Sequence, residues 1–267
     1  MITFPNAKIN IGLNVVSKRT DGYHNLETIF YPVHLSDALE MVLSDKTELT
    51  ISGLEIAGDP SENLVLKAYH LLKKEFGLSP IKFHLHKVIP FGAGLGGGSA
   101  DAAFTLKMLN ESFNLGLSSD TLENYAAKLG ADCAFFIQNK PAFATGIGNQ
   151  FQSVNFHLSD YHIVILKPDI YVNTKDAYQN IIPKIPAFQL TELVKLPLTE
   201  WKNLVVNDFE KSVFLRFPQL KELKELLYNL GATYVSMSGS GSAFYAFFRH
   251  LPVDFDKKIP NGVLIYR

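Results

Sequence analysis

The amino-acid sequence predicts an α+β protein. Strand-like and helix-like segments follow one another without the regular strand–helix alternation that is typical of a parallel α/β sheet. Apolar residues make up 47% of the 267 residues and charged residues 19%, so the chain can bury a substantial core. A polar stretch of weak periodicity at residues 150–159 indicates a boundary, and we expect two domains, 1–152 and 153–267.

The first third of the chain predicts strands followed by a helix. Residues 2–16 and 27–35 have strand character, and the turn signal Asp21-Gly22 lies between them. Apolar residues recur at helical spacing over residues 61–76, with Ser61 placed to cap the helix.

A strand, a glycine-rich loop and two helices come next. Apolar and polar residues alternate over residues 81–89, which predicts a strand. We expect one helix to start at Ser99 and another at Ser119. The second is expected to stop at Gly130, which leaves Asp132 on a loop at its end.

The second half of the chain is also predicted to contain both strands and helices. A connection rich in proline separates its first strand and helix from the rest. The expected elements are strands at 161–166, 233–238, 243–248 and 262–266, and helices at 173–181, 203–215 and 218–229.

The glycine loop is the most informative segment for function. Residues 90–103 read Pro-Phe-Gly-Ala-Gly-Leu-Gly-Gly-Gly-Ser-Ala-Asp-Ala-Ala. Because a strand precedes the loop and a helix follows it, free N–H groups and the positive end of the helix dipole converge there. The segment therefore predicts an anion site, above all for phosphate.

Spacing separates the alternatives for this loop. Gly92-x-Gly94-x-x-Gly97 matches the dinucleotide fingerprint, but that motif needs a strand ending in an acidic residue about 20 residues on. The sequence around residue 120 has helical spacing instead. A P-loop would need a lysine where Gly98 stands. A purely structural glycine turn is the remaining alternative.

Residues 90–103 resemble the phosphate-binding motif of the GHMP small-molecule kinases. Two further segments agree in order and character, at residues 7–10 and 236–242. The resemblance implies a two-domain fold with the active site in the interdomain cleft, ATP as phosphoryl donor, and Mg²⁺.

Three segments narrow the resemblance to GHMP kinases that act on a cytidine diphosphate-linked methylerythritol. They are residues 7–11, 19–26 and 130–136. The implied reaction is ATP-dependent phosphorylation of the 2-hydroxyl of that substrate, in the non-mevalonate route to isoprenoid precursors. Two positions depart from the family pattern, namely Ala100, where a second serine is usual, and Cys133, where a valine is usual.

The resemblance also implies roles for individual residues. Lys8 and Asp132 are the implied catalytic pair, although each taken alone is a solvated charge and sequence cannot show that they meet. The implied acceptor contacts are Asn10, Tyr23, His24 and Tyr178. The implied ATP contacts are Pro90, Phe91, Gly92, Ala93, Gly94, Leu95, Gly96, Gly97, Gly98, Ser99, Ala100, Asn63 and Lys87.

Composition limits the partners. A net charge of −1 argues against nucleic acid as the main partner. A single cysteine suits a reducing compartment, and we expect a cytoplasmic protein without a secretory signal or membrane span. His84 and His86 fall on one polar strand face, where we predict solvent exposure and not a metal site. We expect a monomer or weak dimer that binds a small molecule.

Two other functions stay open from the sequence. A GHMP kinase that acts on homoserine or on a mevalonate is one, although Tyr23, His24 and Asp132 argue against it. The other is a nucleotide-binding module without activity, although such a module needs only the phosphate loop.

Overall fold

The computed structural model of the chain describes residues 1–55, 59–179 and 181–267. These form two compact units, each assembled from separate stretches of the chain. Unit 1 contains Met1–Lys8, His34–Phe91 and Gly96–Lys140, and unit 2 contains Ile9–Val33, Gly92–Leu95 and Pro141–Arg267. The mixture of helices with mainly antiparallel sheets confirms the α+β class. A domain boundary after residue 152 stays a prediction.

Unit 1 is built on a four-stranded sheet in the order β1-β4-β6-β5. Its strands are β1 (Ile2–Thr3), β4 (Ala38–Leu43), β5 (Glu48–Gly53) and β6 (Ile81–Lys87). The predicted alternation of β6 is confirmed, since Ile81, Phe83 and Leu85 are fully buried and the residues between them are exposed. This strand pairs antiparallel with β4 and parallel with β5, neither of which the sequence analysis predicted.

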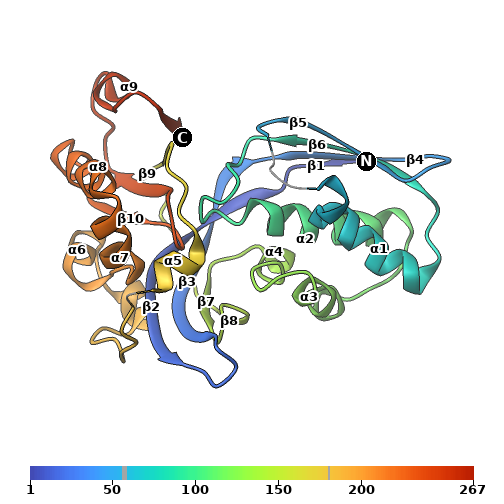
Figure 1. Cartoon of the computed structure of the whole chain (residues 1–267), viewed down its shortest axis with the longest axis horizontal. Coiled ribbons are helices and arrows are strands. Elements are labelled where there is room, and N and C mark those ends of the chain that lie inside the picture. Colours follow the sequence, from blue (N-terminus) through green and yellow to red (C-terminus); the bar gives the residue numbers. More distant parts are fainter. Residues whose placement is uncertain (56–58, 180) are drawn as a thin grey trace. The chain divides into compact units, whose positions relative to one another are not determined.

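Helices cover one face of this sheet, where α1 and α2 lie side by side (Figure 1). The helical segments of unit 1 are η1 (Pro60–Glu62), α1 (Leu64–Phe76), α2 (Gly97–Ser112), α3 (Ser119–Ala127) and α4 (Phe135–Gln138). Both α3 and α4 pack against α2. The start of α2 is thereby fixed between the end of β6 and the α3–α4 connection.

Two predicted helix starts were wrong. Asn63, not Ser61, caps α1, because the Asn63 side chain accepts a hydrogen bond of 2.9 Å from the Val65 N–H. The next predicted helix begins at Gly97 and not after Ser99, since Gly96 takes the left-handed conformation with φ at +73°. Glycine adopts that conformation without strain, so the chain turns into the helix earlier than a serine cap would allow.

Unit 2 contains two antiparallel sheets. The first has the order β2-β3-β7-β8, and the second has the order β10-β11-β9-β12. Their strands are β2 (Asn6–Lys18), β3 (His24–Ser36), β7 (Ala142–Thr145), β8 (Gln150–Ser153), β9 (His162–Pro168), β10 (Tyr234–Met237), β11 (Phe244–Phe248) and β12 (Val263–Tyr266). Residues 6–8 of β2 and 34–36 of β3 belong to unit 1. The four strands predicted in the second half are therefore confirmed to within two residues at each end.

Helices of unit 2 pack on the second sheet, with α8 against β10. The helical segments are α5 (Thr174–Tyr178), η2 (Leu190–Lys195), η3 (Leu198–Glu200), α6 (Trp201–Leu204), α7 (Phe209–Arg216), α8 (Pro218–Asn229) and α9 (Phe255–Lys258). The apolar core of the unit joins residues of β9, β10 and β11 to Phe209, Leu220 and Leu227 of the helices.

A continuous helix over residues 203–215 was a wrong prediction. Residues 205–208 leave the helix because their backbone bonds to β2, with Leu13 N–H donating to Val206 O and Asp208 N–H donating to Leu13 O, both at 2.8 Å. The predicted helix 173–181 is confirmed only as α5, and residue 180 lies outside the described residues.

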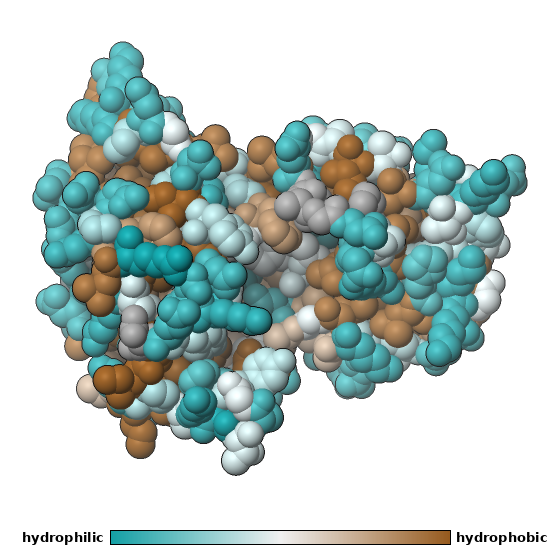
Figure 2. Space-filling model, in the orientation of Figure 1, coloured by the Kyte–Doolittle hydropathy of each residue, from teal (hydrophilic) through white to brown (hydrophobic). Residues whose placement is uncertain are grey.

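Hydrophilic residues cover most of the face shown in Figure 2, with hydrophobic residues scattered between them. Among the described residues, no helix has both the length and the apolar character needed to cross a bilayer.

Candidate active site

The first turn of α2 has backbone N–H groups available for an anion. Its N-cap, Gly96, has no side chain and therefore supplies no capping hydrogen bond, while Ala100 N–H already bonds to Gly96 O at 2.9 Å. A Cβ on Gly97 would lie 2.8 Å from Ile89 Cγ2, so this turn is also packed closely onto the segment after β6. The geometry is that of a helix N-terminus prepared for phosphate.

Lys8 and Asp132 meet at this helix start. Lys8 Nζ lies 3.3 Å from Asp132 Oδ2, with the lysine side chain 4% exposed and the aspartate 32% exposed. A Cβ on Gly96 would lie 3.1 Å from Lys8 Cε and 3.0 Å from Phe136 Cζ. The lysine chain therefore runs along the cap of α2, and the expectation that the two residues meet is confirmed. They come from β2 and from the turn between α3 and α4.

Asn63 and Lys87, which were predicted to contact ATP, form hydrogen bonds with other residues of unit 1. Asn63 caps α1, as described above. Lys87, the last residue of β6, is 4% exposed and donates from Nζ to Asp37 and, at 2.8 Å, to Asp101 Oδ2. The two carboxylates were not predicted as partners of Lys87. The one local signal was an acidic residue, Asp37, between two apolar strand segments.

In unit 2 the glycine loop contacts the Ser-Gly-Ser-Gly turn. Ser238 Oγ donates to Gly94 O at 2.8 Å, and Ala243 N–H donates to Ala93 O at 3.2 Å. A Cβ on Gly94, whose φ is +77°, would lie only 2.0 Å from Ser238 O. This close approach explains the glycine at position 94, and it shows that the turn lies beside the loop.

Asn10 is held by three elements of unit 2. Its side chain donates from Nδ2 to Thr28 Oγ1 at 3.2 Å, and its backbone N–H donates to Ser238 Oγ at 3.2 Å. Tyr245 donates from its hydroxyl to Asn10 O at 2.8 Å. The amide is therefore buried and oriented, at 3% exposure. No sequence pattern pointed to Thr28 or Tyr245.

The predicted acceptor residues on the β2–β3 hairpin differ in their surroundings. The turn is held by Arg19 and Asp21, whose ion pair measures 2.8 Å, and Tyr23 N–H donates to Asp21 Oδ1 at 3.1 Å. The hydrogen bond from Arg19 lowers the pKa of Asp21. Tyr23 itself is 63% exposed.

His24 and Tyr178 stack on each other. Their ring centroids are 4.8 Å apart with planes inclined by 18°, and Tyr178 also meets Phe209 edge to face. Burial, with a smaller contribution from Lys18, lowers the pKa of His24 and favours its neutral form. The structure brings these two predicted residues together, with no space for a base between their rings.

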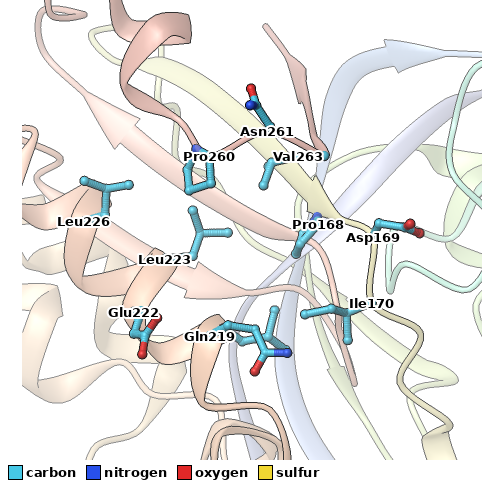
Figure 3. A pocket seen from close by; sticks show the side chains of 12 residues that line it. Pro168, Asp169, Ile170, Gln219, Glu222, Leu223, Leu226, Pro260, Asn261 and Val263 are labelled. Atoms are coloured by element: carbon cyan, nitrogen blue, oxygen red, sulfur yellow. The ribbon is translucent and has the colours of Figure 1, made fainter.

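Unit 2 also contains an apolar cavity of about 690 Å³, formed by α8, the end of β9 and the connection from α9 to β12. Leu223 of α8 faces Pro168 across it, and Pro260 closes a third side (Figure 3). None of the predicted site residues lines this cavity.

Comparison with known proteins places the chain in a family. The family model for the N-terminal domain of GHMP kinases matches residues 63–146, and the model for their C-terminal domain matches residues 189–255. The chain belongs to the GHMP kinase family. This GHMP kinase is 58% identical to 4-diphosphocytidyl-2-C-methyl-D-erythritol kinase of Bacteroides fragilis over 252 residues, which cover 93% of this chain and 92% of that protein. The enzyme of the same name from Cytophaga hutchinsonii is 48% identical and covers 98% of this chain and 97% of its own.

Solved structures agree with this assignment. A crystal structure of 4-(cytidine 5′-diphospho)-2C-methyl-D-erythritol kinase matches with a TM-score of 0.80 and 32% identity, over 92% of this chain and 89% of that one. Mevalonate kinase of Methanococcus jannaschii matches with a TM-score of 0.69 at 12% identity, over 100% of this chain and 96% of that one, which shows a shared fold only.

Proposed function

We propose that this GHMP kinase transfers the γ-phosphoryl group of ATP to the 2-hydroxyl of 4-diphosphocytidyl-2-C-methyl-D-erythritol, in the non-mevalonate route to isoprenoid precursors. Relatives that carry the name of that kinase, at up to 58% identity, support the substrate. The observation that carries the reaction type is the Lys8–Asp132 pair at the glycine-capped start of α2. A carboxylate and an ammonium group beside a helix N-terminus support phosphoryl transfer.

The donor site uses the backbone. N–H groups at the start of α2 would bind the triphosphate together with the rest of the loop, residues 90–100, and the helix dipole would add attraction for negative charge. No lysine stands at the P-loop position in this segment, so main-chain donors carry most of the binding. Asn63 and Lys87 stay predicted to lie near the nucleotide.

A magnesium ion is expected with the ATP. Such an ion takes its ligands largely from phosphate oxygens and water, and a helix N-terminus that holds the phosphates fits that coordination. When bound, it offsets charge on the β- and γ-phosphates.

Lys8 and Asp132 act on the acceptor and on the transferring group. Asp132 would accept a hydrogen bond from the acceptor hydroxyl, orient its oxygen for in-line attack, and receive the proton as the new bond to phosphorus forms. Lys8, at 3.3 Å, would hold the carboxylate in place and stabilise negative charge on the phosphoryl oxygens. Phosphoryl transfer depends mainly on the position of the reacting groups and on charge stabilisation, and this pair would supply both to the acceptor.

The acceptor would be bound by residues of the β2–β3 hairpin and α5. We propose that Tyr23 and His24 contact the cytosine, with Tyr178 covering the base and Asn10 near the methylerythritol end. The exposed Tyr23 ring and the oriented amide of Asn10 support these roles. The His24–Tyr178 stack requires that the base lie on an outer face of the stacked pair. We also propose a cytoplasmic monomer or weak dimer.

An ADP-release assay tests the function. Purified protein with ATP and magnesium should release ADP with 4-diphosphocytidyl-2-C-methyl-D-erythritol, and should do so far more slowly with homoserine or mevalonate. Equal or faster turnover of either alternative would transfer the assignment to another GHMP kinase activity. ATP binding without turnover of any of the three would indicate a nucleotide-binding module.

A further inference from the structure

Asp37, Lys87 and Asp101 form a buried ionic cluster in unit 1. Lys87 is predicted to lie near the nucleotide, but no role has been given to the two carboxylates. Their exposed fractions are 0%, 4% and 2%, respectively. Lys87 Nζ donates to both carboxylates. Asp37 lies between β3 and β4, Lys87 ends β6, and Asp101 lies on α2. The cluster therefore ties the sheet to the helix that starts at the phosphate loop.

The two carboxylates are not equivalent. Asp37 Oδ1 accepts hydrogen bonds from the Val88 and Ile89 N–H groups at 2.6 and 2.8 Å, while its Oδ2 accepts from Lys87. Asp101 Oδ2 accepts from Lys87, but Asp101 Oδ1 is buried without a hydrogen-bond partner. An ionised carboxylate with a buried, unpartnered oxygen is costly, so Asp101 is the member that favours a proton.

Electrostatics agree with this assignment. Burial raises the pKa of Asp101 to about 7, Lys87 opposes the rise, and the negative charge of Asp37 adds to it. The other elements packed against α2 are α1, α3, α4 and β4. Among the described residues, Lys87 and Asp37 are the charged groups that act on Asp101. The proton on Asp101 therefore decides between a cluster with no net charge and one with a net negative charge.

The cluster lies against the first turn of α2. A Cβ on Gly97 would be 3.3 Å from Lys87 Nζ, so the ammonium group touches the turn whose N–H groups are proposed to bind phosphate. An uncompensated negative charge at this place repels a phosphate anion, and burial weakens the screening of that repulsion. Ionised Asp101 would also compete with Asp37 for the Lys87 ammonium more strongly. A shift of the ammonium toward Asp101 would disturb the first turn of α2.

We propose that Asp101 is a positioning residue for the donor site: in its neutral form it lets Lys87 and Asp37 hold the start of α2 for the phosphates of ATP, and its ionisation weakens ATP binding. The inference rests on the proposed function for its ligand. By linkage, ATP binding then favours the protonated carboxyl, so ATP and a rise in pH oppose each other.

Calorimetric titration with magnesium-ATP, without acceptor, tests the proposal. Wild type, Asp101→Asn and Asp120→Asn are compared from about pH 6 to about pH 8.5, across the range in which Asp101 ionises. Asparagine keeps the shape and the acceptor oxygen but cannot ionise, and Asp120 is an exposed aspartate in the first turn of α3 that serves as the matched control. ATP's own ionisation affects all three proteins alike.

The wild type and Asp120→Asn should lose ATP affinity at least about threefold more than Asp101→Asn over this range, as expected for one added charge nearby. Equal pH dependence in Asp101→Asn and wild type would overturn the proposal. A carbon-13 titration of the Asp101 carboxyl in the wild type needs no variant: ATP should raise its pKa. A carboxyl that is fully ionised at neutral pH, or that does not respond to ATP, contradicts the inference.

Failure of the donor site gives a different result. If wild-type protein shows no ATP binding at any pH, the proposed kinase function is wrong. The carbon-13 titration of the free protein would still show whether Asp101 holds a proton near neutral pH, so the two failures can be told apart.

Discussion

Individual glycines define the space of the candidate site at the residue scale. A Cβ on Gly94 would overlap Ser238 O, and a Cβ on Gly96 would press on Lys8 Cε and Phe136. The first glycine lets two backbone segments of unit 2 touch, and the second lets the lysine chain pass beside the cap of α2. Glycine is therefore needed here for packing as well as for phosphate access.

Asp132→Asn should fold normally and lose on the order of a hundredfold or more in kcat, because the amide cannot accept the proton or offset the Lys8 charge. Its partial exposure, at 32%, makes the substitution compatible with folding. Steady-state kinetics with ATP and the cytidine diphosphate-linked acceptor measure the effect, with Asp120→Asn as the control. A kcat near that of the wild type would remove Asp132 from the mechanism.

Tyr23→Ala should raise KM for the acceptor about tenfold, with little change in KM for ATP, because stacking on a base contributes about 1–3 kcal/mol. The exposed ring makes few contacts that the fold needs. Tyr23→Phe keeps the stacking face and should behave like the wild type. If Tyr23→Ala changed both constants equally, the ring would not be specific to the acceptor.

At the scale of elements, caps and loops place the site more than helix propensity does. Asn63 caps α1 two residues after Ser61, and Gly96 caps α2 three residues before Ser99, so neither helix starts at the serine that the sequence favoured. The start of α1 depends on one side-chain hydrogen bond, from Val65 N–H to Asn63. The start of α2 depends on Gly96, which can adopt positive φ. In both, a local rule holds, but several residues satisfy it and packing selects among them.

Asn63→Ala should destabilise unit 1 by about 1 kcal/mol, because Val65 N–H loses its capping acceptor. Chemical denaturation of the whole chain measures the change in the free energy of unfolding. Asn63→Asp retains an acceptor and should restore most of it. Asn63 is also predicted to lie near the nucleotide. If Asn63→Asp regains stability but not ATP affinity, the side chain has a role beyond capping.

At the scale of the whole molecule, the buried cluster predicts how stability changes with pH. The pKa of Asp101 is raised in the folded state, so the folded chain binds a proton that the unfolded chain releases from about pH 4 upward. The stabilising contribution of this group is full at acid pH and is lost as pH rises through about 7.

Asp101→Asn should therefore gain melting temperature relative to the wild type as pH rises, by at least about 2 °C between pH 5 and 8. Differential scanning calorimetry of both proteins across that range measures the difference. Asp120→Asn should run parallel to the wild type. A gap between Asp101→Asn and wild type that stays constant with pH would show that Asp101 is ionised, or neutral, throughout.

Much of the architecture could be predicted from local patterns. The alternation of β6, the strands β9 to β12 and the helix α8 all leave periodic signals in a few consecutive residues. The strands β4, β5 and β7 and the short helix α4 were not predicted. For β4 and β5 the reason is that their place in the sheet depends on pairing with β6, which comes later in the chain. The break between α6 and α7 depends on bonds to a strand about 190 residues earlier, which no local window contains.

Contiguous motifs are enough to identify the family, the phosphate loop and the residue types of the site. Which of those residues meet depends on the packing of the folded chain. Asn10 and Ser238 are 228 positions apart along the chain and yet share hydrogen bonds, and Lys8, near the start of the sequence, pairs with Asp132. The same packing encloses Lys87 between two carboxylates. Long-range contacts of this kind follow from how whole sheets and helices pack, and that packing leaves no signature in neighbouring residues.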